Sequence, residues 1–221
     1  MAIKKTKKPV ISQKEALSTF DLLCELYPNP KTELIYDSPF QLLIAVILSA
    51  QCTDAQVNKA TPSLFANYPT PEKLMNAPLQ KVEKLVHSCG FYRAKAKAII
   101  KTATDIVEKF NGKIPESLDD LTTLAGVGRK TASVVLNQAF DIPAIAVDTH
   151  VLRVSQRLGW ARTDTPEKVE MELRALLPEE LWGAVNGTLI LHGRKVCSAR
   201  KPKCEECPVQ ADCRFYQSQI S

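Results

Sequence analysis

Four cysteines near the C-terminal end of this 221-residue chain could hold a metal centre. Cys197, Cys204, Cys207 and Cys213 follow the spacing C-x6-C-x2-C-x5-C. With no export signal visible, this spacing indicates a metal site rather than a disulfide scaffold. Zinc would sit tetrahedrally among four thiolates, although zinc sites usually pair two short C-x2–4-C turns. An iron–sulfur cluster also takes four thiolates and accepts the wider first gap.

Three cations lie inside that first gap. Arg200, Lys201 and Lys203 surround Pro202, which restricts the backbone of the loop. The loop is either simply solvated or a stiff cationic surface that contacts phosphate while the metal centre fixes its shape.

A second group of residues could act on an electrophilic carbon. Lys130 closes the sequence LAGVGRK, and Asp148 follows eighteen positions later. A lysine must lose its proton to attack carbon, which partial burial or the neighbouring charge of Arg129 would favour. Asp148 stands where a helix should begin. It is therefore either only an N-cap or also a carboxylate that accepts a proton and stabilises positive charge.

The two glycines of the same stretch indicate a turn between helices. We expect a helix over 117–124, a hairpin over 125–128 and a second helix over 129–140. Gly126 and Gly128 would allow a positive φ and would let a phosphate approach the backbone amides. A plain structural hairpin with two surface cations is the alternative.

The elements that must position these residues are predicted to be helices. Capping patterns recur along the chain, and strand-like alternation is nearly absent. The predicted helix starts are Ser12 with Glu15, Ser38-Pro39, Thr53 with Gln56, Thr70-Pro71, Ser117 with Asp120, Asp148, and Thr165-Pro166. Residues 40–50 are apolar on nearly all sides and should form a buried central helix. We therefore predict an all-α protein.

Charge is concentrated at one end of the chain. Of the formal net charge of +5, +4 comes from Lys4, Lys5, Lys7 and Lys8, so the remainder carries +1. Nucleic-acid affinity would have to come from local clusters and helix N-termini rather than from a global field. We expect residues 1–8 to be a disordered basic tail. The longest apolar run, 42–48, is too short to span a bilayer, so we expect a soluble intracellular protein with no membrane partner.

These motifs together resemble one family. LAGVGRKTA, AVDTHVLR, HGRKVCSARKPKCEECPVQADC and FQLLIAVILSAQCTD are similar to the endonuclease III family of DNA glycosylase/AP lyases. The resemblance runs from about Ser12 to Cys213. The chain departs from it at Ala125, where the family usually has proline, which should loosen the turn without touching the chemistry.

The resemblance implies two helical lobes with DNA between them. Residues 32–142 would form a six-helix barrel that contains the helix-hairpin-helix at 117–140. Residues 9–31 and 143–221 would form the second lobe, with a [4Fe-4S] cluster held by the four cysteines at 197–213.

The resemblance also implies roles for single residues. Lys130 would be the Schiff-base nucleophile and Asp148 the catalytic carboxylate. Gln51 would fill the gap left by an extruded nucleotide, and Phe91 would be a second wedge. The further expected DNA contacts are Gly126, Gly128, Arg129, Thr131, His150, Arg200, Lys201 and Lys203.

The implied activity is base-excision repair of damaged double-stranded DNA by a cytoplasmic, nucleoid-associated monomer. Oxidised pyrimidines would be released, and the strand would be cut 3′ to the abasic site by β-elimination. An adenine-mismatch glycosylase is one alternative, but that branch lacks the lysine found at Lys130. A non-catalytic iron–sulfur protein that binds DNA or senses redox state is the other, and it leaves Lys130 and Asp148 without a joint purpose.

Overall fold

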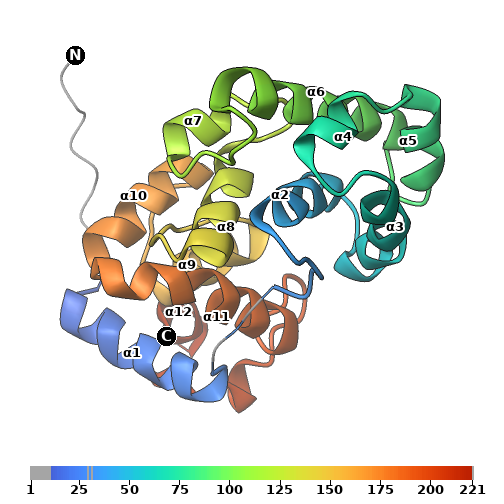
Figure 1. Cartoon of the computed structure of the whole chain (residues 1–221). Coiled ribbons are helices and arrows are strands. Elements are labelled where there is room, and N and C mark those ends of the chain that lie inside the picture. The colour runs from blue at the N-terminus through green and yellow to red at the C-terminus, as the bar shows by residue number, and fades with distance from the viewer. Residues whose placement is uncertain (1–10, 29, 31, 221) are drawn as a thin grey trace. The chain divides into compact units, whose positions relative to one another are not determined.

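The computed structural model describes residues 11–28, 30 and 32–220, and over these residues it contains helices and no strand (Figure 1). The prediction of an all-α protein is therefore confirmed. The predicted basic tail at 1–8 lies outside the described residues. The chain divides into two compact units, Met1–Lys31 with Pro143–Ser221, and Thr32–Ile142. No helix among the described residues is long and apolar enough to cross a membrane.

The unit Thr32–Ile142 contains seven helices, two of which have only five residues. They are α2 (Pro39–Leu48), α3 (Asp54–Asn67), α4 (Pro71–Met75), α5 (Leu79–Leu85), α6 (Tyr92–Phe110), α7 (Leu118–Thr122) and α8 (Arg129–Phe140). The other unit contains α1 (Gln13–Leu26), α9 (Thr149–Leu158), α10 (Pro166–Leu176), α11 (Trp182–Lys195) and α12 (Arg214–Ile220). It also has three short 3₁₀ helices, η1 (Glu179–Leu181), η2 (Cys204–Glu206) and η3 (Gln210–Asp212).

The predicted capping patterns do start helices. The Ser12 hydroxyl accepts a hydrogen bond from the Glu15 amide at 3.3 Å, and the Glu15 carboxylate accepts from the Ser12 amide at 2.7 Å. This reciprocal pair satisfies two amides that the first turn of α1 would leave unpaired. Thr165 makes no side-chain cap, and α10 begins on Pro166 at its first position instead.

The core of the unit Thr32–Ile142 is built around α2. Phe40 and every residue from Leu42 to Leu48 are buried. This helix packs against α3, α6 and α8, which explains why it is apolar on all sides. Because α8 carries Lys130, the same core fixes the orientation of the helix on which that lysine lies.

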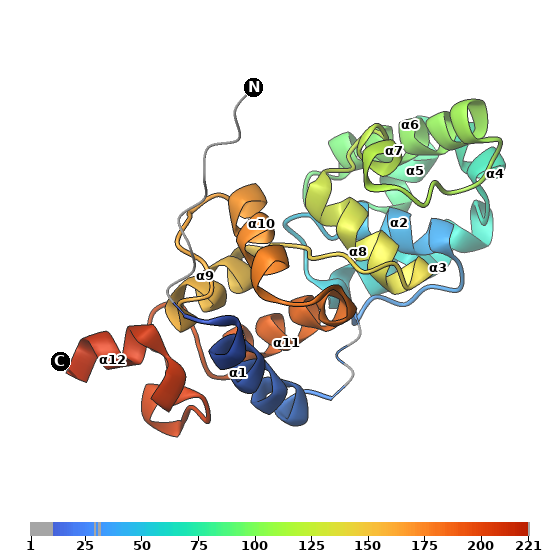
Figure 2. The same ribbon diagram turned by 90° about the vertical axis from the view of Figure 1, so that its left-hand side faces the viewer.

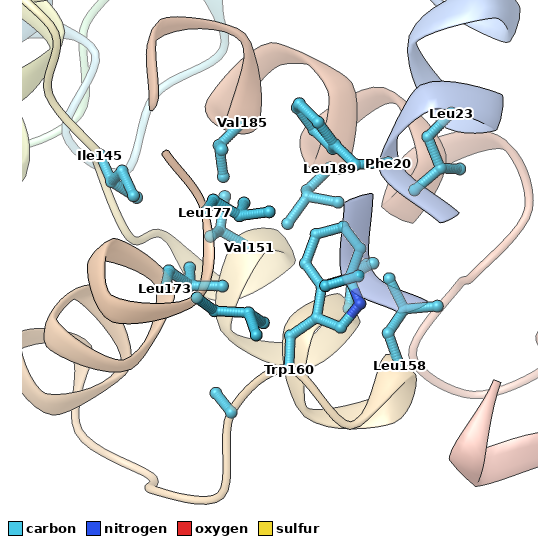
Figure 3. Packing of buried hydrophobic residues seen from close by; sticks show 14 of the residues in the cluster. Phe20, Leu23, Ile145, Val151, Leu158, Trp160, Leu173, Leu177, Val185 and Leu189 are labelled. Atoms are coloured by element: carbon cyan, nitrogen blue, oxygen red, sulfur yellow. The ribbon is translucent and has the colours of Figure 1, made fainter. Parts of the chain in front are cut away.

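The core of the other unit surrounds α9 (Figure 3). The fully buried rings of Phe20 and Trp160 meet edge to face with centroids 5.9 Å apart, joining α1 to the segment that follows α9. Figure 2 shows α1 and α11 side by side, and α11 and α12 both pack against α9. Asp148 stands at the start of this central helix.

Candidate active site and cluster site

The hairpin that precedes α8 is held by close packing at Gly126. This glycine has a φ of +73°, and a Cβ built on it would lie 3.1 Å from the Ala98 Cβ. The Ala125 carbonyl accepts a hydrogen bond from the Thr102 hydroxyl, so α6 fixes the turn despite the missing proline. The helix before the hairpin, α7, is shorter than the predicted 117–124.

Gly128 differs from Gly126 in its backbone conformation. Its φ is −89°, in the extended region, so of the two glycines that would allow a positive φ only Gly126 adopts one. A Cβ there would meet nothing within 4 Å. Gly128 is the N-cap of α8 and makes no side-chain cap bond. The helix therefore begins with amide donors in an open space, which suits an anionic oxygen.

Lys130 is exposed on the first turn of α8. The partial burial considered for it is not found. Arg129 beside it is exposed as well, and Thr131 is half-buried. The first turn of α8 thus presents two exposed cationic side chains beside the open space at Gly128.

Asp148 is the N-cap of α9, as predicted. Its Oδ1 accepts hydrogen bonds from the amides of His150 and Val151, both at 2.8 Å. Oδ2 is not part of this cap, so the same side chain can both start the helix and face a substrate.

His150 is half-buried within the same unit. Its Nδ1 lies 3.1 Å from Nη2 of Arg153, and burial lowers the pKa of the imidazole. A Cβ on Gly193 would come within 2.9 Å of that Nδ1. His150 is therefore packed against α11 as well as lying near Asp148.

Gln51 and Phe91 each lie in an exposed turn between two helices of the unit Thr32–Ile142, and we refer to these two turns as the corners. The backbone of both residues is in the left-handed region, with φ of 53° and 58°, although neither is glycine. Phe91 leaves 70% of its side chain exposed. The corners are adjacent, because a Cβ on Gly90 would lie 3.8 Å from the Gln51 carbonyl oxygen. A left-handed backbone costs free energy at a residue other than glycine, and such residues cluster at sites that bind a ligand.

The four cysteines near the C-terminus line one common cavity with an empty volume of about 350 Å³, part of it open to solvent. Among the described residues, no three His, Cys, Asp or Glu side chains come close enough together to hold a single metal ion. A cube of iron and sulfide holds its four thiolates further apart than one ion does. Four cysteines around one cavity are the donor set that an iron–sulfur cluster takes. Burial raises the pKa of the Cys207 and Cys213 thiols, so the thiolates require a metal to neutralise them.

Two side chains that the sequence analysis did not single out for this site surround the cysteines. Arg157 places Nη1 3.4 Å from the Cys197 sulfur, and His192 places Nε2 3.7 Å from the Cys207 sulfur. Burial lowers the pKa of His192 to about 4, so this imidazole is neutral at physiological pH. A cation and a neutral donor beside thiolates suit a negatively charged cluster. The available signal was the spacing of Arg153 and Arg157, which puts both on one face of α9.

Arg157 also braces the cationic loop. Its guanidinium donates to the carbonyls of Ser198 at 2.7 Å and Ala199 at 2.9 Å. The Val196 carbonyl accepts from the amides of Ser198 and Lys203, both at 3.0 Å, and closes the loop on itself. The side chains expected to meet phosphate remain exposed on this fixed backbone, namely Arg200, Lys201 and Lys203.

Two family models match the chain. Residues 44–179 match the model described as HhH-GPD superfamily base excision DNA repair protein. Residues 197–213, which begin and end on the first and fourth cysteines of the cavity, match the iron-sulfur binding domain of endonuclease III.

Individual relatives match over nearly the whole chain. Endonuclease III of Rickettsia conorii is 48% identical, over 89% of this chain and 94% of the relative. Endonuclease III of a Synechocystis species is 46% identical, over 96% and 97%. A solved structure of a trapped endonuclease III–DNA covalent intermediate superimposes with a TM-score of 0.90 at 43% identity, covering 96% of this chain and 100% of that one.

Proposed function

The chain belongs to the endonuclease III family of base-excision repair proteins, and from this premise we propose how its residues carry out the reaction. It is a DNA glycosylase with AP lyase activity, and it contains a [4Fe-4S] cluster. The observation that carries the proposal is the trapped covalent DNA intermediate of a structure 43% identical to this chain. Such an adduct requires a nucleophile, and Lys130 is an exposed amine at the helix-hairpin-helix.

In this proposal Lys130 attacks C1′ of the damaged nucleotide. The base departs as the new C–N bond forms, and the sugar opens to a Schiff base on the lysine. Loss of a C2′ proton then expels the 3′ phosphate, which cuts the strand 3′ to the lesion. Oxidised pyrimidines in duplex DNA are the proposed substrates.

Asp148 acts on the deoxyribose rather than on the damaged base. Its carboxylate stands at the N-terminus of α9, from where it stabilises the positive charge that develops on the deoxyribose. Oδ1 is fixed by two backbone amides, which orients Oδ2 without a further side chain. The same carboxylate assists proton transfer.

The DNA contacts divide into phosphate and wedge contacts. We assign the backbone amides at Gly126 and Gly128, with Arg129 and Thr131, to phosphates near the lesion. Arg200, Lys201 and Lys203 hold a second stretch of backbone, because Arg157 keeps their loop in one conformation. Gln51 and Phe91 enter the duplex where the nucleotide leaves, and His150 lies near the sugar beside Asp148.

The two compact units correspond to the two lobes in this proposal. Thr32–Ile142 would be the six-helix barrel lobe with the hairpin, and the other unit would be the cluster lobe. Cys197, Cys204, Cys207 and Cys213 would hold the [4Fe-4S] cluster, which supplies structural bracing when bound. The protein would act as a monomer on damaged duplex DNA in the cytoplasm, in contact with the nucleoid.

The test is a panel of duplexes with one defined lesion each, scored separately for base release and strand cleavage. We expect release of thymine glycol and nicking of an abasic duplex. Release of adenine from a mismatch without nicking would favour the alternative function of an adenine-mismatch glycosylase. Binding without either reaction would favour a non-catalytic DNA-binding protein.

A further inference from the structure

Two cysteines outside the cluster lie together beneath the exposed corners of the unit Thr32–Ile142. Cys52 directly follows Gln51, and Cys89 stands two residues before Phe91. The loops that carry them are in contact, since a Cβ on Gly90 would lie 3.8 Å from the Gln51 carbonyl oxygen, and Cys52 is near enough to act on the pKa of Cys89. Neither cysteine forms a disulfide in this structure.

The two thiols differ in accessibility. Cys89 is fully buried, whereas Cys52 is half-buried and reachable from solvent. Burial, together with the neighbouring Cys52, raises the pKa of Cys89 to about 11. An accessible thiol next to a buried resolving thiol is the arrangement found in redox-sensing pairs.

A buried amine lies beside the pair. Lys95 on α6 is only 7% exposed, and its Nζ has no hydrogen-bond partner among the described residues. Its charge acts on Cys89 in the direction that lowers the pKa of the thiol. A thiolate formed at Cys89 during exchange would therefore meet a buried cation that otherwise lacks a partner.

We propose that Cys52 and Cys89 form a reversible dithiol–disulfide pair that a low-molecular-weight disulfide oxidises, tying together the corners that carry Gln51 and Phe91. The Cys52 thiolate attacks one sulfur of the small disulfide, which forms a mixed disulfide and releases one small thiol. Cys89 then attacks the Cys52 sulfur and releases the second small thiol. The protein loses two hydrogens, and the oxidant gains them as two thiols.

The consequence rests on the proposed function of the two corners as DNA wedges. A disulfide holds its two Cα atoms roughly 4.4–6.8 Å apart, so the corners could no longer adjust independently when a nucleotide is extruded. A misplacement of 1 Å in a positioned site can slow catalysis by about 100-fold. We therefore expect base release to be at least about tenfold slower in the oxidised protein.

The experiment incubates the cluster-loaded protein anaerobically with glutathione disulfide and follows the visible absorbance of the cluster throughout. Digestion without reductant should yield a peptide in which Cys52 is joined to Cys89. Single-turnover base release from a thymine glycol duplex should fall, and it should recover after dithiothreitol while the cluster absorbance stays constant.

Three variants make the test specific. Cys52→Ser and Cys89→Ser should each abolish the response to glutathione disulfide, while Cys24→Ser, a half-buried thiol of α1, should keep it. Absence of the cross-linked peptide, or an unchanged rate once it has formed, overturns the proposal. If the reduced protein releases no base at all, the proposed function fails instead, and the peptide still reports on the thiol pair.

Discussion

Replacing Gly126 with alanine should destabilise the protein far more than the same change at Gly128, two residues later. A left-handed backbone costs a residue with a Cβ about 1–2 kcal/mol, and Gly126 has a φ of +73°. The new methyl would also lie 3.1 Å from the Ala98 Cβ, which cannot rotate away, and this adds about 1 kcal/mol. Lower entropy of the unfolded chain offsets about 0.5–1 kcal/mol. The net loss is about 1–2.5 kcal/mol.

Gly128→Ala is the matched control. Its φ of −89° suits any residue, and nothing lies within 4 Å of the added methyl. The gain from lower entropy of the unfolded chain is roughly cancelled by the weaker N-cap that alanine makes, so stability should change by less than about 0.5 kcal/mol. The methyl would nevertheless stand where a phosphate is proposed to approach, so affinity for an abasic duplex should fall. One variant thus loses stability, while the other loses DNA binding at unchanged stability.

Urea unfolding of the cluster-loaded variants measures the difference in stability, and fluorescence anisotropy on a labelled duplex measures binding. Combining Gly126→Ala with Ala98→Gly should recover only the steric part of the loss, as a double-mutant cycle would show. Equal destabilisation by the two alanine substitutions would refute the account of the hairpin.

Three further changes test the other parts of the site. Asp148→Asn keeps a good N-cap, so stability should change by less than about 0.5 kcal/mol while single-turnover base release falls by about 100-fold or more. Arg157→Met should lower the free energy of unfolding, measured with urea, by about 1–3 kcal/mol, because two loop carbonyls and the Cys197 sulfur lose their donor. The visible absorbance of the cluster should also be lost faster in this variant. Binding should weaken with salt at a slope of log K against log salt of about −4.5 for five phosphate contacts, and Lys201→Ala should make that slope shallower by about 0.9.

Features with a local cause could be predicted from the sequence. The caps at Ser12 and Asp148 depend on residues two or three positions away, so the patterns indicated where α1 and α9 begin. The turn at Gly126 likewise needs only its own backbone freedom. The pattern of two glycines does not show which of them takes the positive φ, and the structure places it at Gly126 and not at Gly128.

Features with a long-range cause could not be predicted. The sequence indicates no unusual backbone at Gln51 or Phe91, because tertiary packing imposes the left-handed conformation on ordinary residues. No motif links Cys52 to Cys89 in the sequence, and only the fold brings their loops together. Arg157 had no visible partner, since the carbonyls it binds belong to the distant loop at Ser198 and Ala199.

The proposed mechanism requires that Lys130 forms the covalent bond to DNA. Borohydride reduction during turnover of an abasic duplex converts a Schiff base into a stable adduct, which a denaturing gel separates from free DNA. The account predicts a trapped adduct that maps to Lys130 and is absent in Lys130→Gln, a variant whose exposed side chain should leave folding intact. An adduct of undiminished yield in Lys130→Gln would contradict it.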